Sequence, residues 1–418
     1  MAKPVTDDRP PVWKNPMAWL PHAIAEAALS GRGLPDSVDM RSAWAHLQER
    51  LAAAEELVRS APVNRNPTDD AAGMRHLMVL LAVGIDMALR IDPDPVLAVT
   101  RAKMDDVVTW GLECPDCVYL NAEMRAGETY RLSGNRGTAR YVGLQTMDGM
   151  AATANCLVDD LEMDGDGNFE LLLSADEQPG NWLRLAGDRP VLTVRNFLYD
   201  WDTETPAALT IERVGDGVVP AESAVEPEVS VARQLYALGE FVHDNLKFFL
   251  DFGAMAPSNG FIPPADMSSM GAAAENRPVI GRFELDPGQA LVVEFEPPTG
   301  VYWSISLGNP WLETINYGRH QSSLNGHQAV TDGDGMARFV LSASDPGVAN
   351  WLDTAGHSNG AMLLRCVRTD SAPVPDTRVV PVADVAATLP ADTATTTPAE
   401  RARVIEGRRR NIHERFYR

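Results

Sequence analysis

Hydrophobic positions follow a helical period in the first part of the chain. Between residues 15 and 110, apolar side chains recur every three or four positions, which is typical of amphipathic helices. Asp39 precedes the first long run as a helix cap, and a second helix is expected to open at Thr68. A shorter helix is predicted for residues 97–110. We therefore expect a helical segment over residues 1–112.

The hydrophobic period changes to two at Tyr119, where short alternating segments begin with Gly, Asp and Asn between them. These segments form two sets, one within residues 113–225 and one within residues 281–384. Strands at this spacing are typical of β-sandwiches. The pattern predicts a mainly β protein of α+β type, in which two tandem antiparallel β-sandwich domains follow the helical segment.

Residues 226–280 connect the two sets of strands. They contain an amphipathic helix over residues 229–252 and a loop over residues 253–279 that is rich in Ala, Met, Pro, Ser and Gly. A connection this long without a regular pattern is typical of a functional loop or a linker, and we interpret it as a lid. The composition of residues 385–418 predicts a flexible linker that ends in a basic C-terminal tail.

One segment of the chain occurs twice. Asp164-Gly-Asp-Gly is followed by Asn181-Trp-Leu, and Asp332-Gly-Asp-Gly by Asn350-Trp-Leu, so that aspartate and asparagine are 17 positions apart in one copy and 18 in the other. This spacing implies one supersecondary plan used in both domains. The Asp-Gly segments lack the further ligands and flanking helices of an EF-hand calcium loop, so we interpret them as hairpin turns.

The charge of the chain limits its partners. The 418 residues include 36 Lys and Arg against 58 Asp and Glu, a formal net charge of −22. Such a chain lacks the broad basic surface that nucleic acid or an anionic membrane requires. The N-terminus has no secretion-signal pattern, and no apolar run is long enough to span a bilayer. We expect a cytoplasmic protein that acts on a small molecule, with its C-terminal tail available for assembly into a homo-oligomer.

The cysteines do not indicate a disulfide framework, because four are too few for a chain of this length. Cys114-Pro-Asp-Cys117 is an isolated pair, far from Cys156 and Cys366. A redox motif follows a strand and precedes a helix, whereas the reverse order is expected here. A structural turn is the favoured interpretation, and redox or metal chemistry is the alternative.

The two copies differ at positions suited to chemistry. Arg184 and Asp188 of the first copy correspond to Asp353 and His357 of the second. A histidine oriented by a carboxylate is the usual arrangement of a general base. We therefore predict His357 as a catalytic base and Asp353 as the residue that orients it. A hydrogen-bonded turn is the alternative interpretation.

The densest polar and aromatic stretch of the chain covers residues 311–328, between two strands of the second domain. Loops of this kind on a rigid scaffold commonly bind ligands. This stretch and the second Asn-Trp pair supply the residues predicted to bind substrate: Trp311, Tyr317, Arg319, Gln321, Asn325, His327, Gln328, Asn350 and Trp351. His320 and His327 with His357 are an alternative metal site, but their spacing is not diagnostic, and we expect neither a metal nor another cofactor.

Asp200-Trp-Asp202-Thr-Glu204 carries closely spaced carboxylates of the kind that glycoside hydrolases use. Asp200 and Asp202 would share one face of a strand, because side chains alternate along it. A Thr-Pro-Ala segment follows directly and indicates the end of the strand. We therefore interpret these carboxylates as structural caps.

Three stretches of the chain resemble one family. They are Gly180-Asn-Trp-Leu-Arg-Leu with Asp200-Trp-Asp-Thr-Glu, Tyr302-Trp-Ser-Ile-Ser-Leu with Gln321-Ser-Ser-Leu-Asn-Gly-His-Gln, and Asp345-Pro-Gly-Val-Ala-Asn-Trp-Leu-Asp-Thr-Ala-Gly-His. On these residues the chain is similar to the domain-of-unknown-function family twelve-fourteen, over roughly residues 70–385. The resemblance implies tandem antiparallel sandwiches of jelly-roll type with added helices, an architecture that has been compared with carbohydrate-active folds. A fold alone does not establish a function.

The chain departs from this family at two segments. Relatives generally carry Asn-Pro-Asp-Asn where Cys114-Pro-Asp-Cys117 stands here. That difference favours a turn role for Asp116. They carry Asn-Arg-Gln in place of Arg319-His-Gln321, so a role for His320 is not implied by the family. The resemblance carries over no catalytic residue.

Two functions remain open from the sequence. The first is a cofactor-independent hydrolase of a polar, sugar-like or acyl small molecule, with His357 as base and residues 253–279 as a lid. The second is a non-catalytic ligand-binding or scaffold protein, in which Trp311, Tyr317 and Trp351 form an aromatic stacking platform.

Overall fold

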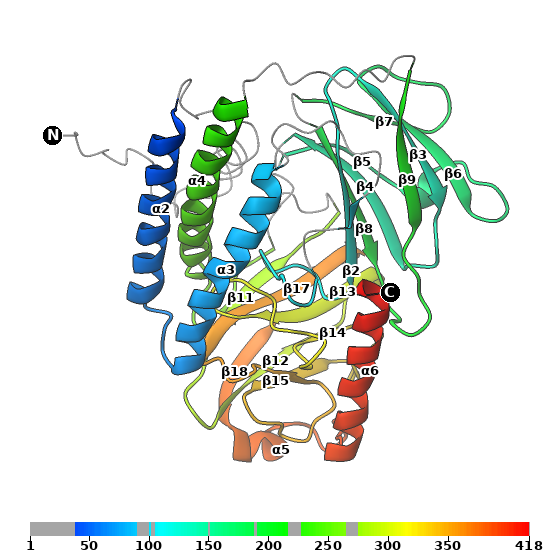
Figure 1. Ribbon diagram of the computed structural model, residues 1–418. Coiled ribbons are helices and arrows are strands. Elements are labelled where there is room, and N and C mark those ends of the chain that lie inside the picture. Colours follow the sequence, from blue (N-terminus) through cyan, green and yellow to red (C-terminus); the bar gives the residue numbers. More distant parts are fainter. Residues whose placement is uncertain are drawn as a thin grey trace.

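The computed structural model describes residues 38–89, 100–101, 105–148, 151–187, 190–215, 227–264 and 275–417. Within these ranges the protein is of mixed α+β type and mainly β. Its strands form four sheets that pair into two sandwich-like halves, and helices α2, α3 and α4 lie together beside them (Figure 1). This arrangement confirms the predicted fold class.

Three long helices make up the helical part: α2 (Met40–Ser60), α3 (Pro67–Leu89) and α4 (Pro227–Gly253). The Asp39 side chain accepts hydrogen bonds from two backbone amides of the first turn of α2, as predicted. The Asn66 side chain does the same at α3. Apolar side chains of all three helices share one buried cluster, which includes Leu47, Leu80 and Leu246.

The first half of the β structure consists of two sheets. The five-stranded sheet has the order β1 (Thr100–Arg101), β2 (Cys117–Glu123), β8 (Pro190–Phe197), β4 (Tyr141–Asp148) and β5 (Ala151–Leu157). The four-stranded sheet has the order β7 (Trp182–Arg184), β6 (Asn168–Ser174), β3 (Thr129–Asn135) and β9 (Ala208–Val214).

The second half repeats this plan. Its five-stranded sheet has the order β10 (Gly260–Phe261), β11 (Val279–Glu284), β17 (Asn359–Thr369), β13 (Gly300–Gly308) and β14 (Ser323–Asn325). Its four-stranded sheet has the order β16 (Trp351–Asp353), β15 (Ala337–Ser342), β12 (Gln289–Phe295) and β18 (Asp376–Pro381). Strand for strand, the two orders match.

The repeated sequence segment lies at the same place in each half. Strand β6 pairs in parallel with β7, and β15 pairs in parallel with β16. Asn181 donates to the carbonyl of Glu170 and Asn350 to the carbonyl of Arg338, at 2.9 and 3.0 Å. The predicted duplication is therefore a duplication of structure, and the shared asparagines serve the turn.

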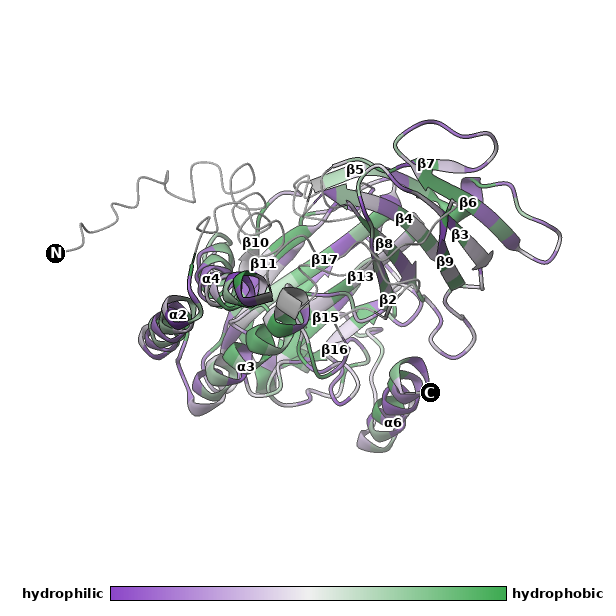
Figure 2. Cartoon of the chain, turned by 45° about the horizontal axis from the view of Figure 1, so that its top comes forward, coloured by the Kyte–Doolittle hydropathy of each residue, from purple (hydrophilic) through white to green (hydrophobic). Residues whose placement is uncertain are grey.

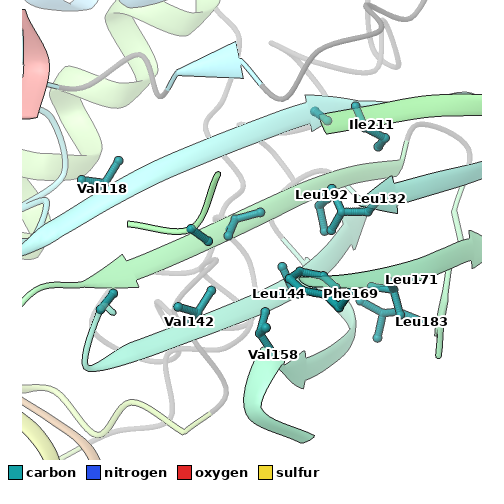
Figure 3. Close-up of a cluster of buried hydrophobic side chains, with 14 of the residues drawn as sticks. Val118, Leu132, Val142, Leu144, Val158, Phe169, Leu171, Leu183, Leu192 and Ile211 are labelled. Atoms are coloured by element: carbon teal, nitrogen blue, oxygen red, sulfur yellow. The ribbon is translucent and has the colours of Figure 1, made fainter. Parts of the chain in front are cut away.

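Each half has its own core between its two sheets. Figure 3 shows that of the first half, where Leu132 of β3 and Ile211 of β9 lie near Leu192 of β8. The period-two pattern produces this arrangement, because alternate side chains of each strand point to the same face. A corresponding cluster in the second half includes Leu291 and Leu364.

The two halves contact each other through their five-stranded sheets. Phe197 of β8 stacks on Tyr302 of β13 with ring centroids 4.7 Å apart. Cys114 and Cys117, at the turn that leads into β2, belong to the same buried cluster. Residues from both halves of the β structure therefore meet at this contact.

Two predictions from the sequence are wrong, one about residues 97–110 and one about the C-terminal region. The helix predicted for residues 97–110 is not formed in the described part of that range, where residues 100–101 are strand β1 and residues 105–108 are bends. The C-terminal region is not a flexible linker with a tail either. Residues 385–388 form helix α5 (Val385–Thr388), and Pro398–Phe416 form helix α6.

Helix α6 packs on the protein although most of its residues are hydrophilic (Figure 2). Arg401 donates to the carbonyl of Val348, and Arg408 donates to the carbonyl of Tyr317. Both arginines are buried, and the Arg408 guanidinium lies 4.6 Å from the ring centroid of Trp201. Composition suggested a solvated tail, but these arginines hold α6 against loops of both halves.

Candidate functional site

The best-defined histidine–carboxylate pair joins helix α3 to the turn before β17. Nδ1 of His357 lies 2.8 Å from Oδ1 of Asp69, which is fully buried. The other carboxylate oxygen of Asp69 accepts from Ser358 Oγ at 2.7 Å and from Asn359 Nδ2 at 3.2 Å. Among the described residues, Nε2 of His357 has no hydrogen-bond partner. The ring is thus held through one nitrogen, and the other is available.

The prediction that Asp353 orients His357 is wrong. Oδ2 of Asp353 lies 2.7 Å from Nδ1 of His320. The two residues that the sequence placed in one pair therefore belong to two pairs, Asp353 with His320 and Asp69 with His357. The reason is the backbone between them, which turns sharply at Ala355 and Gly356.

This turn has an unusual backbone. Ala355 has φ = 51° and Gly356 has φ = 84°, two successive residues in the left-handed region. Only glycine adopts this region without a steric cost, so Ala355 is strained. The Asp353 carboxylate accepts from the Ala355 amide at 2.8 Å and stabilises the turn. Strain of this kind is concentrated at functional sites.

The predicted aromatic platform is wrong, because its three rings are buried. The exposed fractions are 0% for Trp311, 1% for Tyr317 and 7% for Trp351. Trp311 lies against α3 and donates from its indole to the carbonyl of Asp69 at 3.3 Å. These rings pack helices onto the second half and are not available for stacking on a ligand.

Half of the polar residues predicted to bind substrate are bonded within the protein instead. Gln321 donates to the carbonyl of Trp351, Asn325 donates to Asp116, and Asn350 donates to the carbonyl of Val330. All three donors are buried. Their side-chain amides already donate to acceptors within the protein, so the prediction that these three residues bind substrate is wrong.

The remaining three predicted binding residues are less buried. Arg319 is exposed, as is His327, and Gln328 is partly buried. Nε2 of His327 lies 3.9 Å from Asp200, which itself accepts from the Asp202 amide and the Thr203 hydroxyl. Asp200 is therefore a turn cap, as predicted.

A buried polar cluster beneath Trp311 was missed by the sequence analysis. Glu313 accepts from Arg75 at 2.9 Å and from Asn309 at 2.7 Å. His76 of α3 is fully buried, and its Nδ1 lies 3.5 Å from Glu313. Neither ring nitrogen of His76 has a hydrogen-bond partner in the described part of the chain. No spacing in the sequence connects α3 with residues 309–313, so these residues could not be grouped beforehand.

The three histidines of the alternative metal site each lie beside a different carboxylate. His320 pairs with Asp353 and His357 with Asp69, while His327 is closest to Asp200. In the part of the chain that the structure describes, no group of three or more His, Cys, Asp or Glu side chains is arranged to hold a metal ion.

Cys114 and Cys117 bracket a turn, in agreement with the favoured interpretation. The Cys117 amide donates to the Cys114 carbonyl at 3.0 Å, and both thiols are free and buried. Burial raises the pKa of Cys114 to about 11 and that of Cys117 well above its ordinary value. Neither thiol has the lowered pKa of a reactive cysteine.

None of the helices that the structure describes is long and apolar enough to cross a bilayer. This finding agrees with the sequence, in which apolar runs are short.

Comparisons with known proteins identify relatives without a described activity. The family model "Protein of unknown function (DUF1214)" matches residues 283–371. The crystal structure of an uncharacterized protein from Burkholderia cenocepacia is 30% identical, with a TM-score of 0.73 over 86% of this chain and 100% of that chain. The VPA0106 protein from Vibrio parahaemolyticus is 12% identical, with a TM-score of 0.43 over 79% of this chain and 100% of that one. No curated protein matches.

The matched residues 283–371 contain the Asp-Thr-Ala-Gly-His turn and the His320–Asp353 pair, together with His357 but not its partner Asp69. The Burkholderia protein extends the likeness over most of the chain. The chain belongs to the DUF1214 family of proteins of unknown function.

Proposed function

We propose that the protein is a hydrolase of a small polar molecule and that His357 is its general base. The observation that carries the proposal is the His357–Asp69 pair. A fully buried carboxylate holds Nδ1 at 2.8 Å, while Nε2 has no partner among the described residues. A buried acceptor fixes the tautomer and orientation of the ring, which is what a general base requires.

The proposed step uses water as the nucleophile. Nε2 of His357 takes a proton from water as the water oxygen forms a bond to the acyl carbon of the substrate, and the carbonyl π electrons move to the carbonyl oxygen. The carbonyl re-forms when the leaving group departs. Asp69 stabilises the imidazolium that results. The proton then passes from Nε2 to the leaving oxygen when its bond to carbon breaks. The product is a neutral leaving group, and the base is restored.

Covalent catalysis has less support at this pair. The nearest hydroxyl in sequence, that of Ser358, donates to Asp69 at 2.7 Å and is not bonded to His357. Direct attack by water is therefore the mechanism proposed. The second pair, His320 with Asp353, offers a comparable geometry with a more exposed ring and serves as an internal control.

The test is turnover of a panel of small esters, lactones and glycosides by the purified full-length chain. For a substrate that is hydrolysed, His357→Gln is expected to lower kcat/KM by about a hundredfold or more, since general bases contribute roughly 10²–10⁴. The matched variant His320→Gln is expected to retain most of the activity. Equal activity of wild type and His357→Gln would exclude His357 as the base.

Ligand binding without turnover is the second candidate function. It is favoured by the geometry of Ser358, because within the described ranges no nucleophilic side chain is hydrogen-bonded to His357. A ligand that raises the unfolding temperature equally in wild type and His357→Gln, without conversion, would support this function over hydrolysis.

A further inference from the structure

Arg365 carries a buried positive charge on the outer face of the five-stranded sheet of the second half. The residue is 6% exposed. Its Nη1 donates to Ser306 Oγ at 3.0 Å, and its Nη2 donates to the carbonyl of Leu112. No carboxylate of the described residues forms an ion pair with it. A buried charge without a counter-ion is unfavourable, so an anion that pairs with this guanidinium would stabilise the folded protein.

The acidic groups around Arg365 do not supply the missing charge. Burial raises the pKa of Glu113 to about 8, and it raises the pKa of Cys114 to about 11. Burial also raises the pKa of Tyr119 and Tyr302 well above the ordinary range. At neutral pH these four groups are therefore mainly uncharged.

Asp116, the carboxyl group of the same turn, already accepts hydrogen bonds from other donors. It accepts from Trp201 at 2.7 Å, from Tyr302 at 2.5 Å and from Asn325 at 3.0 Å. With three donors already bound, it is not a partner for the guanidinium. Its role is to hold the turn between the two halves.

Two buried polar atoms next to Arg365 have no hydrogen-bond partner among the residues that the structure describes. Ser304 lies directly opposite Arg365 in the pairing of β13 with β17, and its hydroxyl is fully buried without a partner. Oε1 of Glu113 is also buried and unpartnered. Glu113 follows Leu112, whose carbonyl accepts from the guanidinium. Buried polar groups normally have a hydrogen-bond partner, so these two atoms are available to bond a ligand or an ordered water.

The first half provides an internal control for this arrangement. Arg195 of β8 corresponds to Arg365, and Gln145 of β4 accepts from it as Ser306 does in the second half. The residue opposite Arg195 is Gly143, where the second half has Ser304. A side chain at Gly143 has no room, because its Cβ would lie 2.5 Å from the Tyr141 hydroxyl oxygen. The unpartnered hydroxyl is therefore specific to the second half.

We propose that Arg365, Ser304 and Glu113 form a binding site for the carboxylate of a small organic acid. The guanidinium pairs with the carboxylate, and the Ser304 hydroxyl and the protonated Glu113 donate further hydrogen bonds to it. The single positive charge of Arg365 matches the single negative charge of a monocarboxylate. Apolar side chains adjoin the site, among them Leu112 and Leu363, which suit an organic body better than a hydrated inorganic ion.

This site is distinct from the proposed hydrolytic pair. His357 precedes β17, whereas Arg365 lies toward the other end of that strand. A substitution at one site can therefore abolish carboxylate binding or the proposed hydrolytic activity without affecting the other. His357→Gln is expected to leave carboxylate binding unchanged.

The test measures the unfolding temperature of the full-length protein with acetate, propionate and benzoate at constant ionic strength. Sodium chloride and inorganic phosphate are the comparison salts. A saturable rise with at least one carboxylate, absent with the comparison salts, is expected. Ser304→Ala should weaken the apparent affinity about tenfold, since it removes one hydrogen bond to a charged group.

Ser304→Ala carries its own check on folding. Removal of an unpartnered buried hydroxyl should leave the ligand-free unfolding temperature unchanged or raise it. The matched control Ser322→Ala removes a buried hydroxyl that donates to the Ile315 carbonyl at 2.7 Å. It should lower the ligand-free unfolding temperature and leave the carboxylate affinity unchanged.

Three results would overturn the proposal. One is the absence of a saturable response to all three carboxylates. Another is an equal response to chloride or phosphate, which would assign the site to an inorganic anion. The third is a carboxylate affinity that Ser304→Ala leaves unchanged.

Discussion

The indole of Trp311 occupies the space beside Gly73 of helix α3. A Cβ atom at Gly73 would lie 2.6 Å from Cζ2 of Trp311 and 2.7 Å from a methyl carbon of Val58. The fully buried ring thus requires a residue without a side chain on the facing helix. This contact fastens α3, and with it Asp69, to the second half of the protein.

Gly73→Ala is expected to lower the free energy of unfolding by about 1–3 kcal/mol, because overpacking in a close-packed core forces neighbouring groups apart. The measurement is urea unfolding followed by tryptophan fluorescence. Gly407→Ala is the matched control, since a Cβ at Gly407 of helix α6 meets nothing within 4 Å. There the higher helix propensity of alanine should stabilise the protein by up to about 1 kcal/mol. Equal effects of the two substitutions would contradict the packing argument.

The buried carboxyl of Glu113 should make stability depend on pH. Burial raises its pKa to about 8 from an ordinary value of 4.5. Between these values the unfolded chain releases the proton and the folded chain keeps it, so this group lowers stability as pH rises. The contribution of protonated Glu113 to the free energy of unfolding is complete below pH 4.5 and is lost as the pH rises to about 8.

Glu113→Gln removes this titration while retaining the shape of the side chain. Relative to the variant, the wild type should lose up to about 1.4 kcal/mol of unfolding free energy per pH unit between pH 5 and 8. Urea unfolding at a series of pH values measures the difference. Parallel pH profiles of the two proteins would show that Glu113 does not titrate in this way.

The thiols of the Cys114–Cys117 turn should be unreactive in the folded protein. Both are buried, and burial raises the pKa of each thiol. Reaction with a disulfide reagent at pH 8 is expected to be about a hundredfold slower or more than for an exposed cysteine, because little thiolate is present. In urea all four cysteines should react rapidly. Fast reaction of Cys114 or Cys117 in the native protein would restore the redox interpretation.

Local patterns along the chain were sufficient for the elements and their duplication. The change of period at Tyr119 and the repeated Asp-Gly-Asp-Gly and Asn-Trp-Leu segments predicted two β-sandwiches after a helical segment. These signals are local, since alternation and turn residues act over a few positions. The Asp39 cap and the Cys114–Cys117 turn were predicted for the same reason.

Helix α6 could not be predicted from the composition of its segment. A hydrophilic, arginine-rich segment has the composition of a solvated tail. Arg401 and Arg408 are nonetheless buried, because backbone carbonyls of distant loops accept their hydrogen bonds. Those acceptors are in loops of the second half and reach α6 only in the folded chain, so the pattern of α6 alone could not predict its packing.

The sequence by itself determined the long helices α2, α3 and α4, the two sets of strands, the two-fold plan and the residues in which the copies differ. Tertiary structure alone decided which charges meet. Asp353 and His357 are four positions apart, yet the strained turn at Ala355 separates them into different pairs. Asp69 reaches His357 across 288 positions of sequence because α3 packs on the second half. Hydrogen bonds depend on distance in space, and only the folded chain brings such partners together.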